Sequence, residues 1–214
     1  LKGTLDGNNG DDEGDSVPEL SPLTADSYPW FVNTSRWDSP GSSVLLTGAF
    51  TIRCMFMYLG GTAELITCGG ASGETAATNW LYNMEILSTT LVYCFWETGG
   101  GTNCWAKFTL GTALTEGSVH LISLVRTNEG DGTCKLYCYQ NGTACNVSSV
   151  SGLTNNTSYA SGNLPTGGTS SKFYSLGDNS ATDFDEIAKF IQVINVATTH
   201  ASREPEVAAL LGLT

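Results

Sequence analysis

The stretch that decides the fold is Tyr137-Cys-Tyr-Gln-Asn-Gly-Thr-Ala-Cys145 (YCYQNGTAC). Asn-Gly is the strongest short signal for a two-residue type I′ hairpin turn, because both central residues of that turn take positive φ. With Asn141 and Gly142 in the turn, Cys138 lies directly opposite Cys145. The stretch therefore predicts an antiparallel hairpin with two cysteines facing each other across it.

Two further cysteine pairs straddle expected turns. One pair is placed symmetrically about Gly99 and the other about Gly61. The pattern predicts three antiparallel hairpins, whose cysteines are either oxidised or free thiols. Cys134 is left over, and zinc is a poor alternative because residues i and i+4 of a strand lie about 13 Å apart. The candidate disulfides are Cys54–Cys68, Cys94–Cys104 and Cys138–Cys145.

Charge and hydropathy exclude several function classes. The chain has 214 residues and a net charge of −12, which argues against binding to nucleic-acid phosphates or to an anionic membrane. No apolar run approaches the roughly 18 residues of a membrane span. Residues 1–27 carry much of the acidity and read as a flexible acidic arm, so we expect one folded domain over residues 28–214.

From Tyr28 onward, short β-branched and aromatic runs alternate with Gly, Asn and Ser clusters. The run from Phe50 to Leu59 is apolar on both faces, as in a strand covered on two sides. Residues 151–172 are rich in Ser, Gly, Asn and Thr and predict a long loop. Near the end of the chain, Ser202 as a cap and Pro205 in a first turn predict one or two helical turns over Val207 to Leu211.

Four segments, in order, resemble the laminin-G-like (LamG/pentraxin-type) branch of the concanavalin A-like jelly rolls. The first is similar to "LTGSFTISAWF", the second to "WHHVAVTYD", the third to "VKLYVNG" and the fourth to "LYIGS…GYIDEVRIY". The resemblance implies an all-β fold, a two-sheet antiparallel jelly-roll sandwich with one short C-terminal helix. It covers roughly residues 28–212. The four segments are 46–56, 119–127, 135–142 and 173–190.

The same resemblance bears on catalysis and metals. Relatives that hydrolyse glycans carry a Glu-x-Asp-x-x-Glu strand, which this chain lacks. The nearest acidic cluster, Asp183-Phe-Asp-Glu186, falls on a position that is structural in the family. We therefore expect no enzyme activity. Calcium is common in laminin-G-like relatives, and Asp178 and Asp183, with Asp131 as a third possibility, are the candidate ligands. Unmetallated turn aspartates are the alternative.

Exposed aromatic residues stack on sugar faces, although they are also ordinary sheet formers. Four of them form the candidate ligand-binding set: Trp80, Tyr82, Trp96 and Trp105. Among the N-x-S/T sequons, Asn155 and Asn156 in the predicted long loop are the candidate glycosylation sites.

Together these features predict a non-catalytic surface module for recognition or adhesion, binding a carbohydrate or a protein surface. The alternative is a structural virion component, a decoration, fibre or capsid-surface protein that contacts other virion or surface-layer subunits. A glycoside hydrolase or lyase on the same fold is a third reading. The expected location is extracellular, on a cell surface or on a virion surface.

Overall fold

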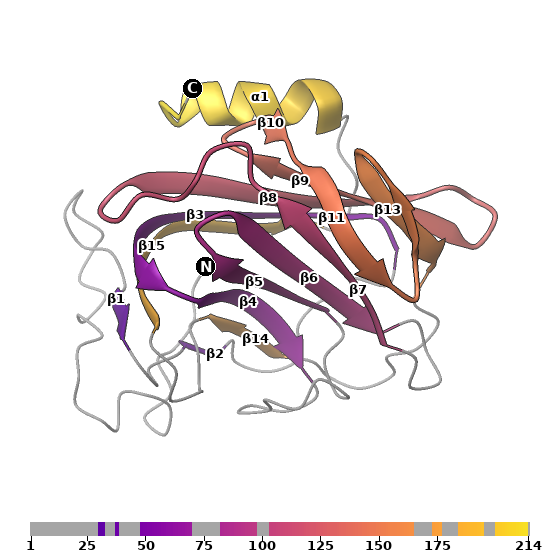
Figure 1. The fold of residues 1–214 in the computed structure, drawn as a ribbon, viewed down its shortest axis with the longest axis horizontal. Helices are drawn as coiled ribbons and strands as arrows, with labels where there is room; N and C mark the ends of the chain where they lie inside the picture. Colours follow the sequence, from indigo (N-terminus) through magenta and orange to yellow (C-terminus); the bar gives the residue numbers. More distant parts are fainter. Residues whose placement is uncertain are drawn as a thin grey trace.

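The computed structural model describes residues 30–32, 37–38, 48–69, 82–97, 103–164, 173–176, 184–194 and 200–213. Within these residues, an eight-stranded and a seven-stranded antiparallel sheet stack face to face, and one helix lies on the outer surface of the first (Figure 1). The all-β two-sheet prediction with one C-terminal helix is confirmed. The predicted arm, residues 1–27, lies outside the described residues.

The sheet that carries the helix is called here the helix-side sheet. Its strand order is β1-β15-β3-β8-β9-β13-β12, with β10 beside β9. Its strands are β1 (Trp30–Val32), β3 (Phe50–Gly61), β8 (Val119–Asn128), β9 (Thr133–Gln140), β10 (Thr143–Ala144), β12 (Thr154–Asn156), β13 (Tyr159–Asn163) and β15 (Phe184–Ile194).

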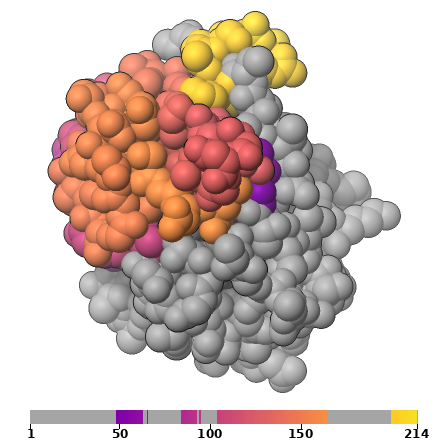
Figure 2. Space-filling model, turned by 90° about the vertical axis from the view of Figure 1, so that its right-hand side faces the viewer, coloured from indigo at the N-terminus to yellow at the C-terminus, as the bar shows by residue number. Residues whose placement is uncertain are grey.

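The opposite layer is called here the far sheet, with strand order β11-β7-β6-β5-β4-β14-β2. Its strands are β2 (Trp37–Asp38), β4 (Ala63–Gly69), β5 (Tyr82–Ser88), β6 (Leu91–Glu97), β7 (Asn103–Thr109), β11 (Asn146–Ser151) and β14 (Phe173–Leu176). In Figure 2, β11 and the β12–β13 hairpin (orange) share one side of the sandwich below α1 (yellow).

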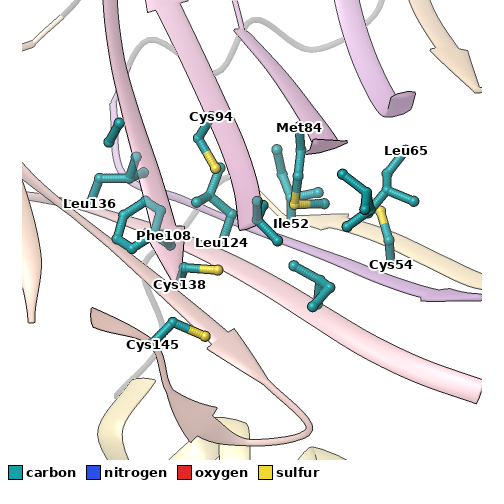
Figure 3. Close-up of a cluster of buried hydrophobic side chains, with 14 of the residues drawn as sticks. Ile52, Cys54, Leu65, Met84, Cys94, Phe108, Leu124, Leu136, Cys138 and Cys145 are labelled. Carbon is teal, nitrogen blue, oxygen red and sulfur yellow. The ribbon is translucent and has the colours of Figure 1, made fainter. Parts of the chain in front are cut away.

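The core lies between the two sheets (Figure 3). Ile52 and Leu124 of the helix-side sheet face Met84 and Phe108 of the far sheet, and all four are 0–2% exposed. Burying a side chain of this size stabilises the fold by about 1.5–3 kcal/mol. The thiols of Cys54, Cys94 and Cys138 belong to the same apolar layer, where they act as small hydrophobic groups.

The Asn-Gly hairpin is confirmed in its predicted register. Asn141 has φ 47° and Gly142 has φ 79°, as a type I′ turn requires. The Cys145 amide donates to the Cys138 carbonyl at 2.9 Å, so the two cysteines are direct partners. Asn141 also joins the turn to β8, because its amide and side-chain oxygen both bond the backbone of Leu121 at 2.8 Å.

The helix α1 (His200–Leu210) is longer than predicted and begins before the expected cap at Ser202. Pro205 lies inside it, so the prediction of a start near Pro205 is wrong. The helix is held down by a fully buried ion pair: Arg53 of β3 donates from Nε and Nη2 to the Glu204 carboxylate at 2.9 and 2.6 Å. It ends in a Schellman motif at Gly212, whose φ is 72°.

Gly142 is the point of closest approach between the hairpin and α1. A Cβ built on Gly142 would lie 2.7 Å from the Pro205 Cα and 3.0 Å from both the Ala208 Cβ and the Glu204 carbonyl oxygen. Glycine at this position therefore allows both the positive φ of the turn and the close approach of α1 to the hairpin.

Besides the start of the helix, three predictions need correction. The turn at Gly60 and Gly61 crosses from one sheet to the other, so Cys54 lies beside Ile122 and Ile191 while Cys68 pairs with Tyr82. The β6–β7 hairpin exists, but Cys94 pairs with Ala106 and Cys104 pairs with Trp96. The partner of Cys94 is thus two residues beyond the expected Cys104. Residues 151–172 are not simply a loop, because β12 and β13 pair as a hairpin at the sheet edge.

Candidate functional site

The aromatic residues predicted to bind a ligand fall into separate places. Trp80 lies outside the described residues. Tyr82 and Trp96 are direct register partners, and Trp96 also pairs with Cys104. Trp105 occupies the neighbouring register position, opposite Phe95. Successive positions of a strand alternate between the two faces of a sheet, so Trp96 and Trp105 do not share a face.

The face of the far sheet that carries Trp105 points away from the core. On β7, Ala106 and Phe108 are completely buried, whereas Trp105 and Lys107 are half-buried and Thr109 is exposed. The same alternation on β6 buries Cys94. Trp105 and Lys107 therefore belong to an open face of the sandwich.

The register defines two rows across this open face. By residue type, the first row holds hydroxyl, amide, acidic and aromatic residues, and the second holds hydroxyl, basic, acidic and aromatic residues. Residues of these types can contact both the polar groups and the apolar face of a ligand. The first row passes through Ser151, Trp105, Phe95, Asn83, Thr67, Ser175 and Asp38. The second row passes through Ser149, Lys107, Tyr93, Glu85 and Glu64.

The Trp105–Lys107 pair lies on β7, one strand in from the β11 edge of this face. The Lys107 ammonium lies over the indole ring, 5.3 Å from its centroid. A cation held this way is attracted by the ring quadrupole and stays beside the ring instead of swinging into solvent. Ser149 and Ser151 of β11 flank the pair as cross-strand neighbours. The arrangement places an apolar ring, an ammonium group and two hydroxyls within one small area.

The sequence did not single out Lys107, Ser149 or Ser151. The signal for Lys107 was present, because Trp105-x-Lys107 is an i, i+2 pair on one strand and such residues share a face. The two serines could not be found from the sequence, because their place beside β7 depends on the order of strands in the sheet.

Six of the seven cysteines are buried free thiols: Cys54, Cys94, Cys104, Cys134, Cys138 and Cys145. The neighbouring Cys145 sulfur and burial raise the pKa of Cys138, whereas the neighbouring Cys138 lowers the pKa of Cys145. Burial raises the pKa of Cys94. Cys138 and Cys145 are the two cysteines that lie directly opposite each other across the hairpin (Figure 3).

The candidate calcium ligands Asp178 and Asp183 lie outside the described residues. The third, Asp131, bonds the Thr133 amide and hydroxyl at 2.9 and 2.5 Å and so shapes the β8–β9 turn. These hydrogen bonds lower the Asp131 pKa. In the described ranges, no three His, Cys, Asp or Glu residues are grouped so that they could hold a metal ion.

The candidate glycosylation residues lie on the edge strand β12. Asn155 is exposed, and it pairs with Ala160 of β13. Asn156 is half-buried, and its side-chain amide donates to the Ser161 hydroxyl at 3.3 Å. Asn155 is thus the more accessible of the two.

Comparison with solved structures identifies the fold. The CBM40 module of Ruminococcus gnavus IT-sialidase is 13% identical, with 81% of this chain and 92% of that one aligned at a TM-score of 0.51. The same module bound to alpha2,6 sialyllactose aligns at a TM-score of 0.51 with 12% identity, over 83% of this chain and 98% of that one. The chain has the concanavalin A-like jelly-roll fold.

Other proteins resemble this jelly roll at a lower level. A heptameric SAP-like pentraxin from Limulus polyphemus is 12% identical over 87% of this chain and 78% of its own, with a TM-score of 0.48. Neither a protein-family model nor a curated protein matches the sequence. In the described part of the jelly roll, no helix is long and apolar enough to cross a membrane.

Proposed function

We propose that this jelly roll is a non-catalytic recognition module that binds glycans through the open face of the far sheet. The observation that carries the proposal is the Trp105–Lys107 pair, a half-buried indole with a cation fixed above it. A sugar ring would stack its C–H face on the indole, and the Lys107 ammonium would bind its hydroxyl or carboxylate oxygens.

Two further observations support this function. The flanking Ser149 and Ser151 supply donors and acceptors at the rim of the indole. The R. gnavus module with the same fold is described bound to alpha2,3 and alpha2,6 sialyllactose, so a sandwich of this kind is able to carry glycan binding. A location outside the cell, on a cell or particle surface, fits such a role.

A calcium ion is part of the proposal only as an ion bound by Asp178 and Asp183. The acidic residues in the described part of the chain are not grouped into a metal site. The non-catalytic part of the proposal is supported by the groups beside the Trp105–Lys107 pair. These are an ammonium and two serine hydroxyls, which bind oxygen atoms, whereas glycoside hydrolysis needs a pair of carboxylates placed on either side of the scissile bond.

A glycan array tests the proposal. Wild-type protein is compared with Trp105→Ala and Lys107→Met, in buffers with calcium and with a chelator. Thr109→Ala serves as control, because Thr109 lies on the same strand but is exposed beyond the pair. We expect Trp105→Ala to weaken binding at least about tenfold, or 1.4 kcal/mol, with Thr109→Ala unchanged. Absence of any glycan signal in both buffers would refute the proposal.

A further inference from the structure

A second group of half-buried aromatic rings lies on the opposite side of the molecule, on the outer surface of the helix-side sheet. It consists of Tyr137 of β9, Tyr159 of β13 and His200 at the start of α1, and is called here the aromatic strip. Leu136 and Ala160 are register partners and are both completely buried, so Tyr137 and Tyr159 point outward beside each other.

The three rings of the strip form a continuous row, in which Tyr137 contacts both Tyr159 and His200. The centroids of Tyr137 and Tyr159 are 5.5 Å apart, with the planes tilted by 42°. The Tyr137 and His200 centroids are 4.1 Å apart, with a tilt of 32°. The buried Tyr139 hydroxyl bonds His200 Nδ1 and fixes the imidazole orientation. All three rings are held by contacts within the protein and remain partly open to solvent.

Polar groups border the strip at the end nearest Tyr159. The Lys135 ammonium lies 5.5 Å from the Tyr159 centroid and 2.6 Å from a Glu129 carboxylate oxygen. The Thr127 hydroxyl donates to the same carboxylate at 2.6 Å. Lys135 and Glu129 are 33% and 30% exposed, so a ligand can reach both. Ser161 of β13 is the register partner of Lys135, and its hydroxyl accepts a hydrogen bond from the Asn156 side-chain amide of β12.

We propose that the aromatic strip is a second binding site, which takes an uncharged saccharide. A sugar ring placed on Tyr159 and Tyr137 has its apolar C–H face covered, and its hydroxyls meet a donor and an acceptor held 2.6 Å apart in the Lys135–Glu129 pair. Adjacent hydroxyls of a sugar need this combination, because each one both donates and accepts.

The charge of the border selects against acidic ligands. Lys135 is already paired with Glu129, so a ligand carboxylate would have to break that pair and would face the Glu129 charge. Burial lowers the pKa of His200 and raises the pKa of Tyr137, which keeps both groups neutral near pH 7. The charge of Glu204, which is ion-paired with Arg53, acts on the His200 pKa in the opposite direction to burial.

The strip differs from the open face of the far sheet, where the Lys107 ammonium lies over its indole. The two sites are on opposite sheets, so one variant can be used as the control for the other. The proposal of the second site does not depend on that of the first, so either proposal can be refuted while the other stands.

The test uses immobilised neutral oligosaccharides of hexoses and N-acetylhexosamines, with sialylated and uronate-containing oligosaccharides beside them. Tyr159→Ala removes the outermost ring, and Glu129→Gln removes the charge of the acceptor while leaving its shape. Trp105→Ala is the control on the other sheet. Far-UV circular dichroism and the unfolding midpoint establish that each variant is folded.

We expect Tyr159→Ala to weaken binding of a neutral oligosaccharide by roughly threefold to tenfold, the worth of one aromatic contact. Glu129→Gln should weaken the same ligand, and Trp105→Ala should leave it unchanged. Three outcomes overturn the inference: no neutral saccharide binds, neutral binding survives Tyr159→Ala but is lost in Trp105→Ala, or the strip variants affect only binding to a protein. The second outcome would leave the far-sheet proposal standing.

Discussion

Replacing Gly142 with alanine tests the link between the Asn-Gly hairpin and α1. Two costs add at this position. An alanine at φ 79° pays about 1–2 kcal/mol for a left-handed backbone. Its Cβ would also lie 2.7 Å from the Pro205 Cα, which is backbone and cannot rotate away, and overpacking of this kind costs about 1–3 kcal/mol. The expected loss in the free energy of unfolding is therefore about 2–5 kcal/mol.

Gly132→Ala is the matched control for this experiment. Gly132 has φ 86°, close to that of Gly142, and nothing lies within 4 Å of its Cβ position. Urea denaturation of both variants separates the two terms, because Gly132→Ala carries only the backbone cost of about 1–2 kcal/mol. Equal losses in the two variants would show that α1 does not rest on the hairpin, and the reasoning would be refuted.

Three further predictions follow from buried groups. Glu204→Gln removes the negative charge that faces the buried Arg53 guanidinium. Urea denaturation should therefore show a free energy of unfolding lower by about 3–5 kcal/mol, and a decrease below about 1 kcal/mol would contradict this prediction. Burial lowers the pKa of His200 in the folded state, so the unfolded chain takes up the proton at a higher pH than the folded chain. The free energy of unfolding should therefore fall as the pH drops below about 6.5. If the His200→Gln variant lost stability as steeply as the wild type, His200 would not be the cause of the pH dependence. Oxidised glutathione should lower the number of free thiols per chain by two, because it joins Cys138 to Cys145 in a disulfide and is itself reduced to two molecules of glutathione. The Cys145→Ser variant should lose no thiols by this route. A loss of six thiols in the wild type would contradict the register.

The local turns of this protein were predictable because their chemistry is local. Asn141-Gly142 predicted the β9–β10 turn and its pairing, since a type I′ turn fixes the register of the two strands that it joins. The turn between β8 and β9 is local in the same sense, because Asn128 and Asp131 stabilise it by accepting hydrogen bonds from the nearby backbone amides of Gly130 and Thr133.

The partners of strands across the sandwich were not predictable in the same way. Gly60 and Gly61 marked a turn correctly, but a glycine pair does not state whether the chain returns in the same sheet or crosses to the other. The cysteine pairing of Cys54 with Cys68 failed for that reason. A shift of one pair in the β6–β7 hairpin likewise separated Cys94 from Cys104, because a Gly-rich connection does not fix register as an Asn-Gly turn does.

The sequence by itself determined the fold class, the long strand that begins at Phe50 and the hairpin at Asn141-Gly142. The strand and the hairpin depend on residues close together in the chain. The tertiary structure alone decided which side chains meet. It placed Ser149 and Ser151 beside Trp105, and it brought His200 to Tyr137 from 63 positions away. These contacts arise from the order of strands and the docking of α1 through Arg53 and Glu204, and both are set by packing over long sequence distances.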